Sequence, residues 1–175
     1  KRQLAKERAF VDDVTQAYNA GYLLKTFENE IQRSERYGSP LSVLFLDLDH
    51  FKDVNDEYGH LVGAEALRRL CRVLEQCVRQ VDTLARYGGD EFSILLVGTD
   101  HETALDVAER IRKRIDRYVF EVDRDIRLSL TLSIGVSTCP AHGVVRDRLL
   151  DLADKAMYRA KSEGRNRVCS ANDVT

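Results

Sequence analysis

Four acidic residues stand where apolar segments of the sequence end. Asp47 and Asp49 close one such segment, and Asp90 and Glu91 lie between two others. If these segments are neighbouring strands, three or four carboxylates meet at one edge of a sheet, where like charges repel strongly unless a cation neutralises them. Carboxylate oxygens are the ligands that Mg²⁺ prefers, usually together with substrate phosphates. The pattern predicts a magnesium site. The alternative is a solvated turn at Asp90 and a polar strand end at Asp47.

Basic and polar residues that suit a phosphate-bearing ligand occur in two further segments. Lys161 and Arg165 are four residues apart near the end of a helical pattern, where Gly164 can end the helix. Two cations at this spacing can hold phosphate oxygens, although they can also complement the dipole at a helix C-terminus. A loop or single helical turn after the acidic segment adds Lys52, Asn55, Asp56 and His60. Acids for a metal and cations for phosphate together predict a nucleoside triphosphate site.

The elements that position these groups follow from the hydrophobic periodicity. Helices are predicted at 22–37, 63–79, 101–118 and 146–163. Strands are predicted at 41–49, near 82–87 and 91–97, at 125–137, and in a short segment through Arg167 and Val168. The segments 82–87 and 91–97 form a hairpin whose tip holds Gly and Asp, because these residues tolerate positive φ. The predicted fold class is α/β of the α+β type, with helices flanking a central, mostly antiparallel, five-stranded sheet.

Length, charge and cysteine spacing limit the class of protein. The 175 residues, of 20.0 kDa, suit one domain, and the net charge of -2 gives no basic surface for nucleic acid. No apolar run approaches the ~20 residues that span a bilayer, and no signal-peptide pattern opens the chain, so a cytoplasmic location is expected, without a membrane contact for this fragment. The cysteines lack CxxC spacing and are expected to be reduced thiols: Cys71, Cys77, Cys139 and Cys169. Residues 1–10 are expected to end a linker helix, residues 11–170 to form the domain, and 171–175 to form a tail.

Six segments of the chain resemble a known family. DDVTQAYN, DLDHFKDVNDEYGHLVG, RQVD, RYGGDEF, TLSIGVS and ADKAMYRAKSEGRN stand in the order found in the GGDEF-domain diguanylate cyclases, over roughly residues 12–168. The resemblance implies a nucleotidyl-cyclase fold like a polymerase palm. It also implies a nucleotidyltransferase of bacterial signalling that joins two GTP molecules into cyclic di-GMP, with release of pyrophosphate. Each domain of a homodimer would hold one nucleotide.

The resemblance also implies a role for each matching residue. Two Mg²⁺ ions per site, replaceable by Mn²⁺, would be held by Asp47 and Asp90 with the backbone carbonyl of Leu48. Glu91 would be a further ligand or help to deprotonate the attacking 3′-hydroxyl, and the catalytic set is Asp90, Glu91 and Lys52. Such a division suits phosphoryl transfer, which needs mainly positioning and charge stabilisation.

The substrate-binding residues implied by the resemblance lie on both sides of the acids. Gly88 and Gly89 would let the hairpin backbone approach the phosphates, which a Cβ would obstruct. Lys52, Lys161 and Arg165 would neutralise the triphosphate, and Asn55 would bond the base. The remaining positions of the substrate site are Asp56, His60, Ala64 and Leu67.

Ala64 departs from the family pattern. The usual GHxxGD segment reads Gly59-His60-Leu61-Val62-Gly63-Ala64 here, so the acid that would bond guanine and repel adenine is missing. A hybrid-promiscuous branch of the family replaces this acid, typically with serine, and makes cyclic GMP-AMP. The departure predicts relaxed purine selectivity, with ATP as a second substrate. A strictly GTP-specific cyclase in which Asn55 alone keeps the guanine preference, or an engineered alanine, are the alternatives.

A second motif predicts regulation by the product. Arg79 and Asp82 match the inhibitory RxxD motif of the family, and Arg110 matches a further arginine of that site. Arginines can fork onto the phosphates of a cyclic dinucleotide, whereas the alternative is an ordinary surface ion pair. An upstream sensory or receiver domain is expected as a partner. The competing function is a catalytically weak module that only binds cyclic dinucleotide. Such modules usually lack the hairpin acids or the lysine, whereas Asp90, Glu91 and Lys161 are all present here.

Overall fold

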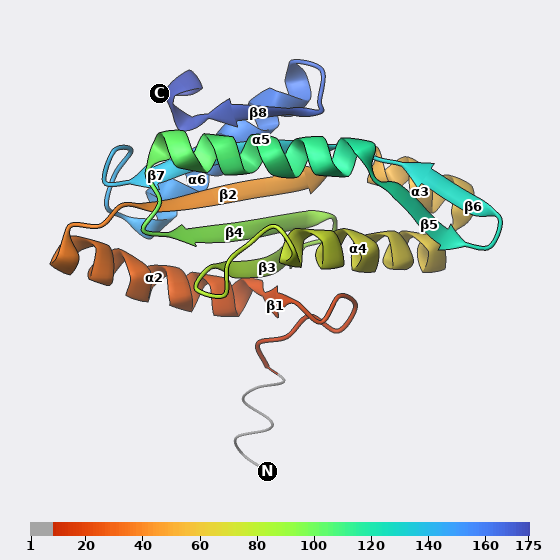
Figure 1. Cartoon of the computed structure of the whole chain (residues 1–175), viewed down its shortest axis with the longest axis horizontal. Coiled ribbons are helices and arrows are strands. Elements are labelled where there is room, and N and C mark those ends of the chain that lie inside the picture. The colour runs from red at the N-terminus through yellow and green to blue at the C-terminus, as the bar shows by residue number, and fades with distance from the viewer. Residues whose placement is uncertain (1–8) are drawn as a thin grey trace, which may run out of the picture.

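The computed structural model of the chain describes residues 9–175, so residues 1–8 of the expected linker helix lie outside the described part. Figure 1 shows a central sheet with helices on both sides. Six strands follow the order β1-β3-β4-β2-β7-β8: β1 Tyr18–Asn19, β3 Thr83–Gly88, β4 Glu91–Val97, β2 Leu41–Leu48, β7 Leu132–Cys139 and β8 Arg167–Ser170. The helices are α2 Ala20–Tyr37, α3 Phe51–Tyr58, α4 His60–Glu75, α5 His101–Arg117 and α6 Arg146–Ser162, and a 3₁₀ turn, η1, covers Ala171–Asp173. A separate two-stranded sheet joins β5 Val119–Asp123 to β6 Ile126–Ser129.

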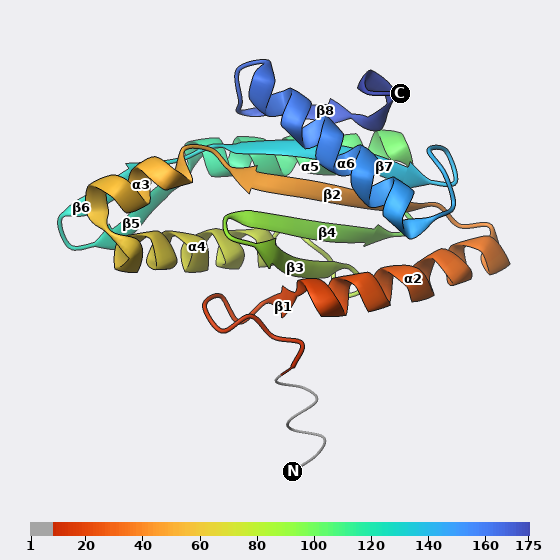
Figure 2. The ribbon, with the colours of Figure 1, turned by 180° about the vertical axis from the view of Figure 1, so that it is seen from behind.

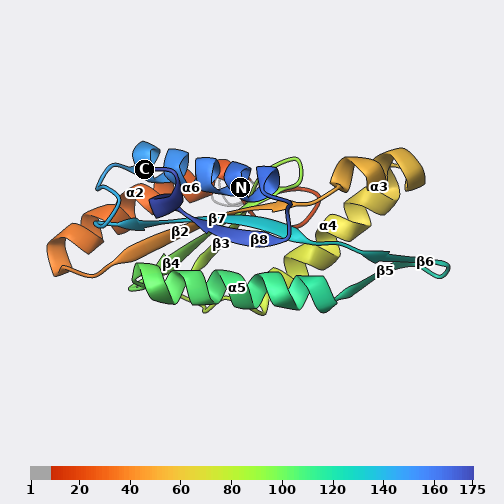
Figure 3. The ribbon, with the colours of Figure 1, turned by 90° about the horizontal axis from the view of Figure 1, so that it is seen from above.

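The helices divide between the two faces of the sheet. Helices α2 and α6 cover one face and α4 and α5 the other, as the view from above shows (Figure 3). Alternation along β2 explains the division, because Val43 and Phe45 pack toward α2 and α6 while Leu44 and Leu46 pack toward α4 and α5. All residues of β2 are buried, as a central strand covered on both faces requires.

The predicted fold class is confirmed, but four details are wrong. The sheet has six strands rather than five, because the two-residue strand β1 pairs in parallel with β3. The predicted strand 125–137 is two strands, β6 and β7, which belong to different sheets. The segment after Asp49, predicted as a loop or one turn, is the helix α3, and α4 begins at His60 rather than at residue 63.

One glycine brings helix α6 close to the sheet. A Cβ built on Gly135 of β7 would lie 2.0 Å from the backbone oxygen of Ala153 and 2.4 Å from the backbone nitrogen of Met157. Both contacts are with main-chain atoms of α6, so any larger residue would push the helix away. The helix crosses the sheet at this short separation (Figure 2), and its C-terminal turn reaches the end of β2.

Candidate active site

Asp47 is the centre of the candidate site. It lies near the end of β2, is 4% exposed, and accepts a hydrogen bond of 2.5 Å at Oδ2 from Nζ of Lys161, in the last turn of α6. Its other oxygen, Oδ1, is buried and has no hydrogen-bond partner among residues 9–175. Burial raises the pKa of Asp47 to about 7, and the nearby Asp90 acts in the same direction, although Lys161 opposes both. Lys161 therefore contacts an acid at the end of β2, and its role is not limited to complementing the dipole at the C-terminus of its own helix.

The hairpin between β3 and β4 brings the other two acids to Asp47. Glu91 is the first residue of β4 and lies directly opposite Asp47 in the antiparallel register, and the backbone oxygen of Asp90 accepts a hydrogen bond of 3.2 Å from Leu48 N. Burial raises the pKa of Glu91, and the charges of Asp154 and Asp90 raise it further. Asp154, on α6, has no role in the sequence predictions, because only the packing of α6 on β7 brings it near Glu91. The predicted convergence of acids from two strands is therefore present in the structure.

Asp49 does not join this acidic group. Its side chain is 1% exposed and accepts hydrogen bonds from Thr131 Oγ1, Ser133 Oγ and the backbone nitrogen of Asn166. The sequence-based expectation that both acids of the segment could meet the hairpin therefore holds for Asp47 alone.

The donor set fits a hard divalent cation. The carboxylates of Asp47 on β2 and of Asp90 in the hairpin turn lie beside each other, and the unpartnered oxygen of Asp47 would gain a partner in a bound ion. No group of three or more His, Cys, Asp or Glu side chains within residues 9–175 has the arrangement of a complete metal site. An ion held by Asp47 and Asp90 would therefore need backbone and substrate oxygens as further ligands, which is how Mg²⁺ is usually bound.

Arg86 holds the tip of the hairpin and was missed by the sequence predictions. Its Nε and Nη2 donate to the backbone oxygen of Gly89 at 2.9 Å and 2.7 Å, and its Nη1 lies 3.1 Å from Oδ1 of Asp12. Gly89 has φ +47, whereas no positive φ occurs at Gly88 or Asp90, so only one tip residue uses the left-handed region that we expected for the turn. A hollow of about 450 Å³ beside the two glycines is also lined by Arg86 and by the first residues of α2. An arginine two positions before a Gly-Gly turn is a sequence pattern that could have identified Arg86.

The predicted base-binding residues form a second group between α3 and α4. Asn55 lies against Gly63, where a Cβ would come within 1.9 Å of its Oδ1, so the glycine lets the two helices meet around this amide. Ala64 follows at a half-buried position of α4, and Leu67 is 3% exposed within the core. Lys52, Asp56 and His60 are exposed on the same pair of helices. The helices that carry these residues follow directly on the strand end that carries Asp47.

Arg165 lies in the turn after α6. It is exposed and has φ +63, between Gly164 at φ +121 and Asn166 at φ +46. Its backbone nitrogen donates to Ala160 O at 2.9 Å, which closes the end of the helix.

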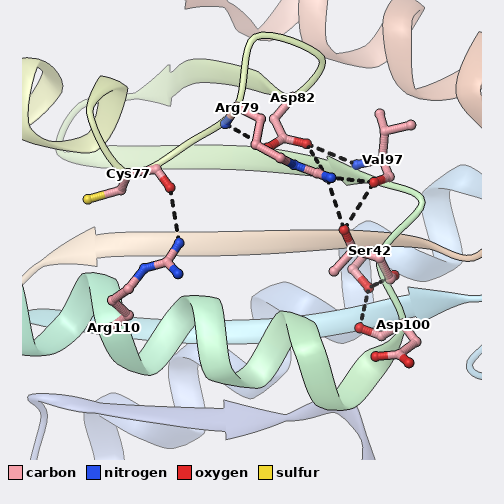
Figure 4. A network of polar contacts seen from close by, with 8 residues as sticks. Ser42, Cys77, Arg79, Asp82, Val97, Asp100 and Arg110 are labelled. Atoms are coloured by element: carbon pink, nitrogen blue, oxygen red, sulfur yellow. Dashed lines mark hydrogen bonds and ion pairs between the residues drawn. The ribbon is translucent and has the colours of Figure 1, made fainter.

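The predicted inhibitory residues meet at the opposite part of the sheet from Lys161. Nε and Nη2 of Arg79 donate to the two oxygens of Asp82 at 3.1 Å and 2.9 Å, and Nη2 also donates to Val97 O at 2.6 Å. The Asp82 side chain is 1% exposed and that of Arg79 is 58% exposed. Arg110 extends from α5 and donates to Cys77 O at 3.4 Å (Figure 4). Arg79, Asp82 and Arg110 line one pocket of about 370 Å³, so the ion pair exists and also borders a cavity.

No helix in the part of the chain that the structure describes is both long and apolar enough to cross a membrane.

Comparisons with known proteins agree with this geometry. The chain is 39% identical over 166 residues to the diguanylate cyclase DosC of Escherichia coli and 38% identical over 164 residues to the response regulator PleD of Caulobacter vibrioides. These matches cover 95% and 93% of this chain, and the chain spans about a third of the length of the two relatives, 36% of each.

Solved structures give the same result. The GGDEF domain of PA1120 from Pseudomonas aeruginosa superposes with a TM-score of 0.88 at 30% identity, over 92% of this chain and 94% of that one. The GGDEF domain of DgcB from Caulobacter crescentus, solved in complex with c-di-GMP, superposes with a TM-score of 0.85 at 27% identity, over 93% of each chain. The sequence profile "Diguanylate cyclase, GGDEF domain" matches residues 9–167. Asp47, Lys161 and the hairpin acids all lie inside this matched region. The chain belongs to the GGDEF family of diguanylate cyclases.

Proposed function

We propose that this chain is the catalytic domain of a dinucleotide cyclase that condenses two molecules of GTP into cyclic di-GMP and two of pyrophosphate. The observation that carries the proposal is the surroundings of Asp47: a buried carboxylate with one unpartnered oxygen, beside Asp90, with Lys161 on its other oxygen. This arrangement offers opposite charges for a cation and for the phosphates that accompany it. Asp47, Asp90, Glu91 and Lys161 are all present, which argues against a module that only binds cyclic dinucleotide.

In the proposed reaction each domain binds one nucleotide. Lys161, Arg165 and Lys52 bind the triphosphate, and Gly88 and Gly89 allow the backbone to approach it. The 3′-oxygen of one nucleotide forms a bond to the α-phosphorus of the other while the bond to pyrophosphate breaks, and the same exchange at the second site closes the ring. Burial raises the pKa of Glu91, and this favours it as the group that accepts the 3′-hydroxyl proton near neutral pH. Bound Mg²⁺, or Mn²⁺ in its place, would neutralise the acids and the triphosphate.

Because one domain supplies half of the reacting pair, we infer that the active species is a homodimer. The rate per domain is then expected to rise with domain concentration until the dimer is saturated. In the complete protein an upstream sensory or receiver domain would set this association. This part of the proposal rests on the need to bring two bound nucleotides together, which one site cannot do.

A second candidate product follows from Ala64. An alanine side chain cannot accept a hydrogen bond from guanine or repel adenine, so a mixed cyclic GMP-AMP product is proposed beside cyclic di-GMP. Asn55, which lies against Gly63 near this position, supports the strictly GTP-specific alternative, since its amide offers both a donor and an acceptor to a base.

One experiment tests the cyclase proposal. Purified domain is incubated with GTP and Mg²⁺, pyrophosphate release is followed, and the nucleotide products are resolved by mass spectrometry. Cyclic di-GMP should form, and Asp90→Asn and Asp47→Asn should abolish it, whereas Asp123→Asn, at an exposed residue at the end of β5, should not. If pyrophosphate is released equally by Asp90→Asn, the acids are not the catalytic centre. Repeating the assay at several GTP to ATP ratios, with Ala64→Asp as the comparison, decides selectivity: a product that stays all-guanine at every ratio rejects the mixed cyclase.

A further inference from the structure

Asp49 is a buried carboxylate that the proposed reaction does not use. It follows the last residue of β2, two positions after Asp47, and its side chain accepts three hydrogen bonds. Thr131 Oγ1 and Ser133 Oγ donate at 2.6 Å and 2.7 Å, and the third donor is the backbone nitrogen of Asn166 at 3.0 Å. None of the Lys, Arg or His residues within 9–175 forms an ion pair with it. A buried charge satisfied only by neutral groups requires each of those donors to be in place.

The donor from Asn166 belongs to an unusual turn. Gly164, Arg165 and Asn166 have φ values of +121, +63 and +46, so three successive residues are in the left-handed half of the map. Two of them carry a Cβ, for which this conformation is unfavourable, although Asn tolerates it better than most residues. A backbone held in this way needs ties from the surrounding structure.

Two side chains from distant parts of the chain supply these ties at Asn166. Asp49 accepts the backbone N–H, and Nη1 of Arg112, on α5, donates to Oδ1 of the Asn166 side chain at 2.8 Å. Arg112 is itself fixed by Glu109, to which Nε and Nη2 donate at 2.9 Å and 2.7 Å, and its side chain is 15% exposed. The turn is therefore held from the sheet on one side and from α5 on the other.

This turn determines where two of the proposed phosphate-binding cations lie. Lys161 precedes the turn in the last helical residues of α6, and Arg165 is part of it. Asp47 binds Nζ of Lys161, and Asp49 binds the main chain of Asn166, so two acids of one strand end hold both ends of the segment 161–166.

We propose that Asp49 and Arg112 are positioning residues, which hold the turn 164–166 so that Lys161 and Arg165 face the acids at the end of β2. The inference rests on the proposed function, because it takes the two cations to bind the triphosphate. Long cationic side chains lose conformational entropy when they bind a ligand. A backbone that is already fixed reduces the entropy that is lost on binding. A displacement of about 1 Å at a reacting centre lowers a rate by about 100-fold, so a loosened turn affects catalysis without any contact with substrate.

The test is a double-mutant cycle. Asp49→Ala and Arg112→Gln are each made in the wild-type chain and in a Lys161→Ala/Arg165→Ala background, with Lys113→Gln on the same helix as the matched control. Thermal unfolding first establishes that each variant is folded at the assay temperature. In the wild-type chain we expect kcat/KM for GTP to fall about 10- to 100-fold for both variants and to be unchanged for the control. In the background that lacks the two cations, the same substitutions should change kcat/KM by less than about twofold.

An equal loss in both backgrounds overturns the proposal, since the residues would then act on the fold or on another group. If Asp49→Ala does not fold, Arg112→Gln alone provides the test. Arg112 is partly exposed, so its substitution is expected to disturb the fold less. Asp49→Asn retains one acceptor oxygen for Asn166 N, so it should recover part of the activity lost in Asp49→Ala.

A binding measurement separates this inference from the proposed function. Affinity for inorganic triphosphate with Mg²⁺, measured by calorimetry, should fall about tenfold in Asp49→Ala and not in Lys113→Gln. If the wild-type chain binds triphosphate but makes no cyclic dinucleotide, the cyclase proposal fails. The ratio of the triphosphate affinities of wild type and Asp49→Ala still decides the role of Asp49. If the affinity is equal in wild type and Asp49→Ala, the positioning role is rejected even when the enzyme is active.

Discussion

Lys161 donates a 2.5 Å hydrogen bond to one oxygen of Asp47, and the other oxygen of this buried carboxylate has no partner in the region 9–175. The pair links the last turn of α6 to the central strand β2, so a single contact joins the proposed phosphate-binding and metal-binding groups. Asp47 and Asp90, whose mutual repulsion contributes to the raised pKa of Asp47, would together hold a cation at this free oxygen.

We therefore expect Mg²⁺ to stabilise the folded domain. At a concentration ten times its dissociation constant, a ligand that binds only the folded state adds about 1.4 kcal/mol to the free energy of unfolding. Thermal unfolding in EDTA and in Mg²⁺, with a non-hydrolysable GTP analogue, measures the difference. Asp47→Asn and Asp90→Asn should lose the Mg²⁺-dependent rise in Tm, and Asp123→Asn should keep it. An undiminished rise in Asp47→Asn would place the cation elsewhere.

Gly88 and Gly89 should differ in what an added methyl group does. Gly89 has φ +47, so Gly89→Ala is expected to lower the free energy of unfolding by about 1 kcal/mol. Gly88 has no atom within 4 Å of a built Cβ and no positive φ, so Gly88→Ala should change stability by less than about 0.5 kcal/mol. If phosphates approach this backbone, Gly88→Ala nevertheless raises KM for GTP by about tenfold. Urea unfolding and steady-state kinetics check both variants, and an unchanged KM in Gly88→Ala would exclude close approach at this residue.

The hydrogen bonds from Arg86 to the backbone oxygen of Gly89 should keep the tip of the hairpin well ordered. Arg86→Gln removes both hydrogen bonds to the Gly89 carbonyl and the ion pair with Asp12, so kcat is expected to fall about tenfold. Asp12→Asn leaves the two bonds to Gly89 and should have a smaller effect. Hydrogen exchange of the amides at residues 87–91 should become faster in Arg86→Gln. Equal exchange in wild type and Arg86→Gln would show that the tip is ordered by other contacts.

Arg110 should contribute to inhibition by cyclic di-GMP. It lines the same pocket as Arg79 and Asp82 and makes one 3.4 Å hydrogen bond to Cys77 O. Loss of a charge-assisted hydrogen bond of about 1.4 kcal/mol in Arg110→Gln would raise the inhibition constant about tenfold. Arg117→Gln, near the end of the same helix, is the control.

Cys77 gives an independent measure of occupancy, because it also lines this pocket and the other three cysteines are buried. Cyclic di-GMP should slow its alkylation in the wild-type domain. Alkylation at the same rate with and without cyclic di-GMP would contradict binding at this pocket.

His101 should make stability depend on pH. Its Nδ1 and Nε2 lie 2.9 Å and 2.6 Å from the hydroxyls of Thr138 and Ser170, and burial, together with the nearby His142, lowers the pKa of His101. The other charged groups that influence it are Asp100 and Asp173, which oppose this shift. Since the unfolded chain then takes up the proton at a higher pH than the folded chain, stability should be highest above about pH 6.5 and decrease as the pH falls through the lowered pKa.

Urea unfolding between pH 7.5 and pH 5 measures this decrease. The slope with pH should be smaller in His101→Gln, which can retain hydrogen bonds without titrating. The same slope in the variant would assign the dependence to other groups.

The parts of the fold that could be predicted are those with strong periodic patterns. The apolar segment 41–49 is β2, and the pattern over 146–163 is α6, because each has an uninterrupted apolar face. Helix α3 was missed because its single buried residue is Val54, so it has almost no apolar face. The two residues of β1 are too few for any alternation to be recognised.

The candidate site shows the same limit. The acids of the hairpin and of β2 could be predicted to meet, because turn residues and apolar runs define both strands. The apolar pattern alone does not distinguish Asp47 from Asp49, since both follow the same run; only the family resemblance separates them, and in the structure the packing of β7 and of the turn at Asn166 gives them different partners. Arg112 was not predicted because its partner lies 54 residues away in the chain.

The two outermost strands of the main sheet, β1 and β8, contain only two and four residues. A short border exposes few main-chain groups to which another polypeptide could add by β-pairing. For the dimeric reaction proposed above, two copies of the domain could in this way meet at high local concentration without an attendant tendency to grow into fibrils.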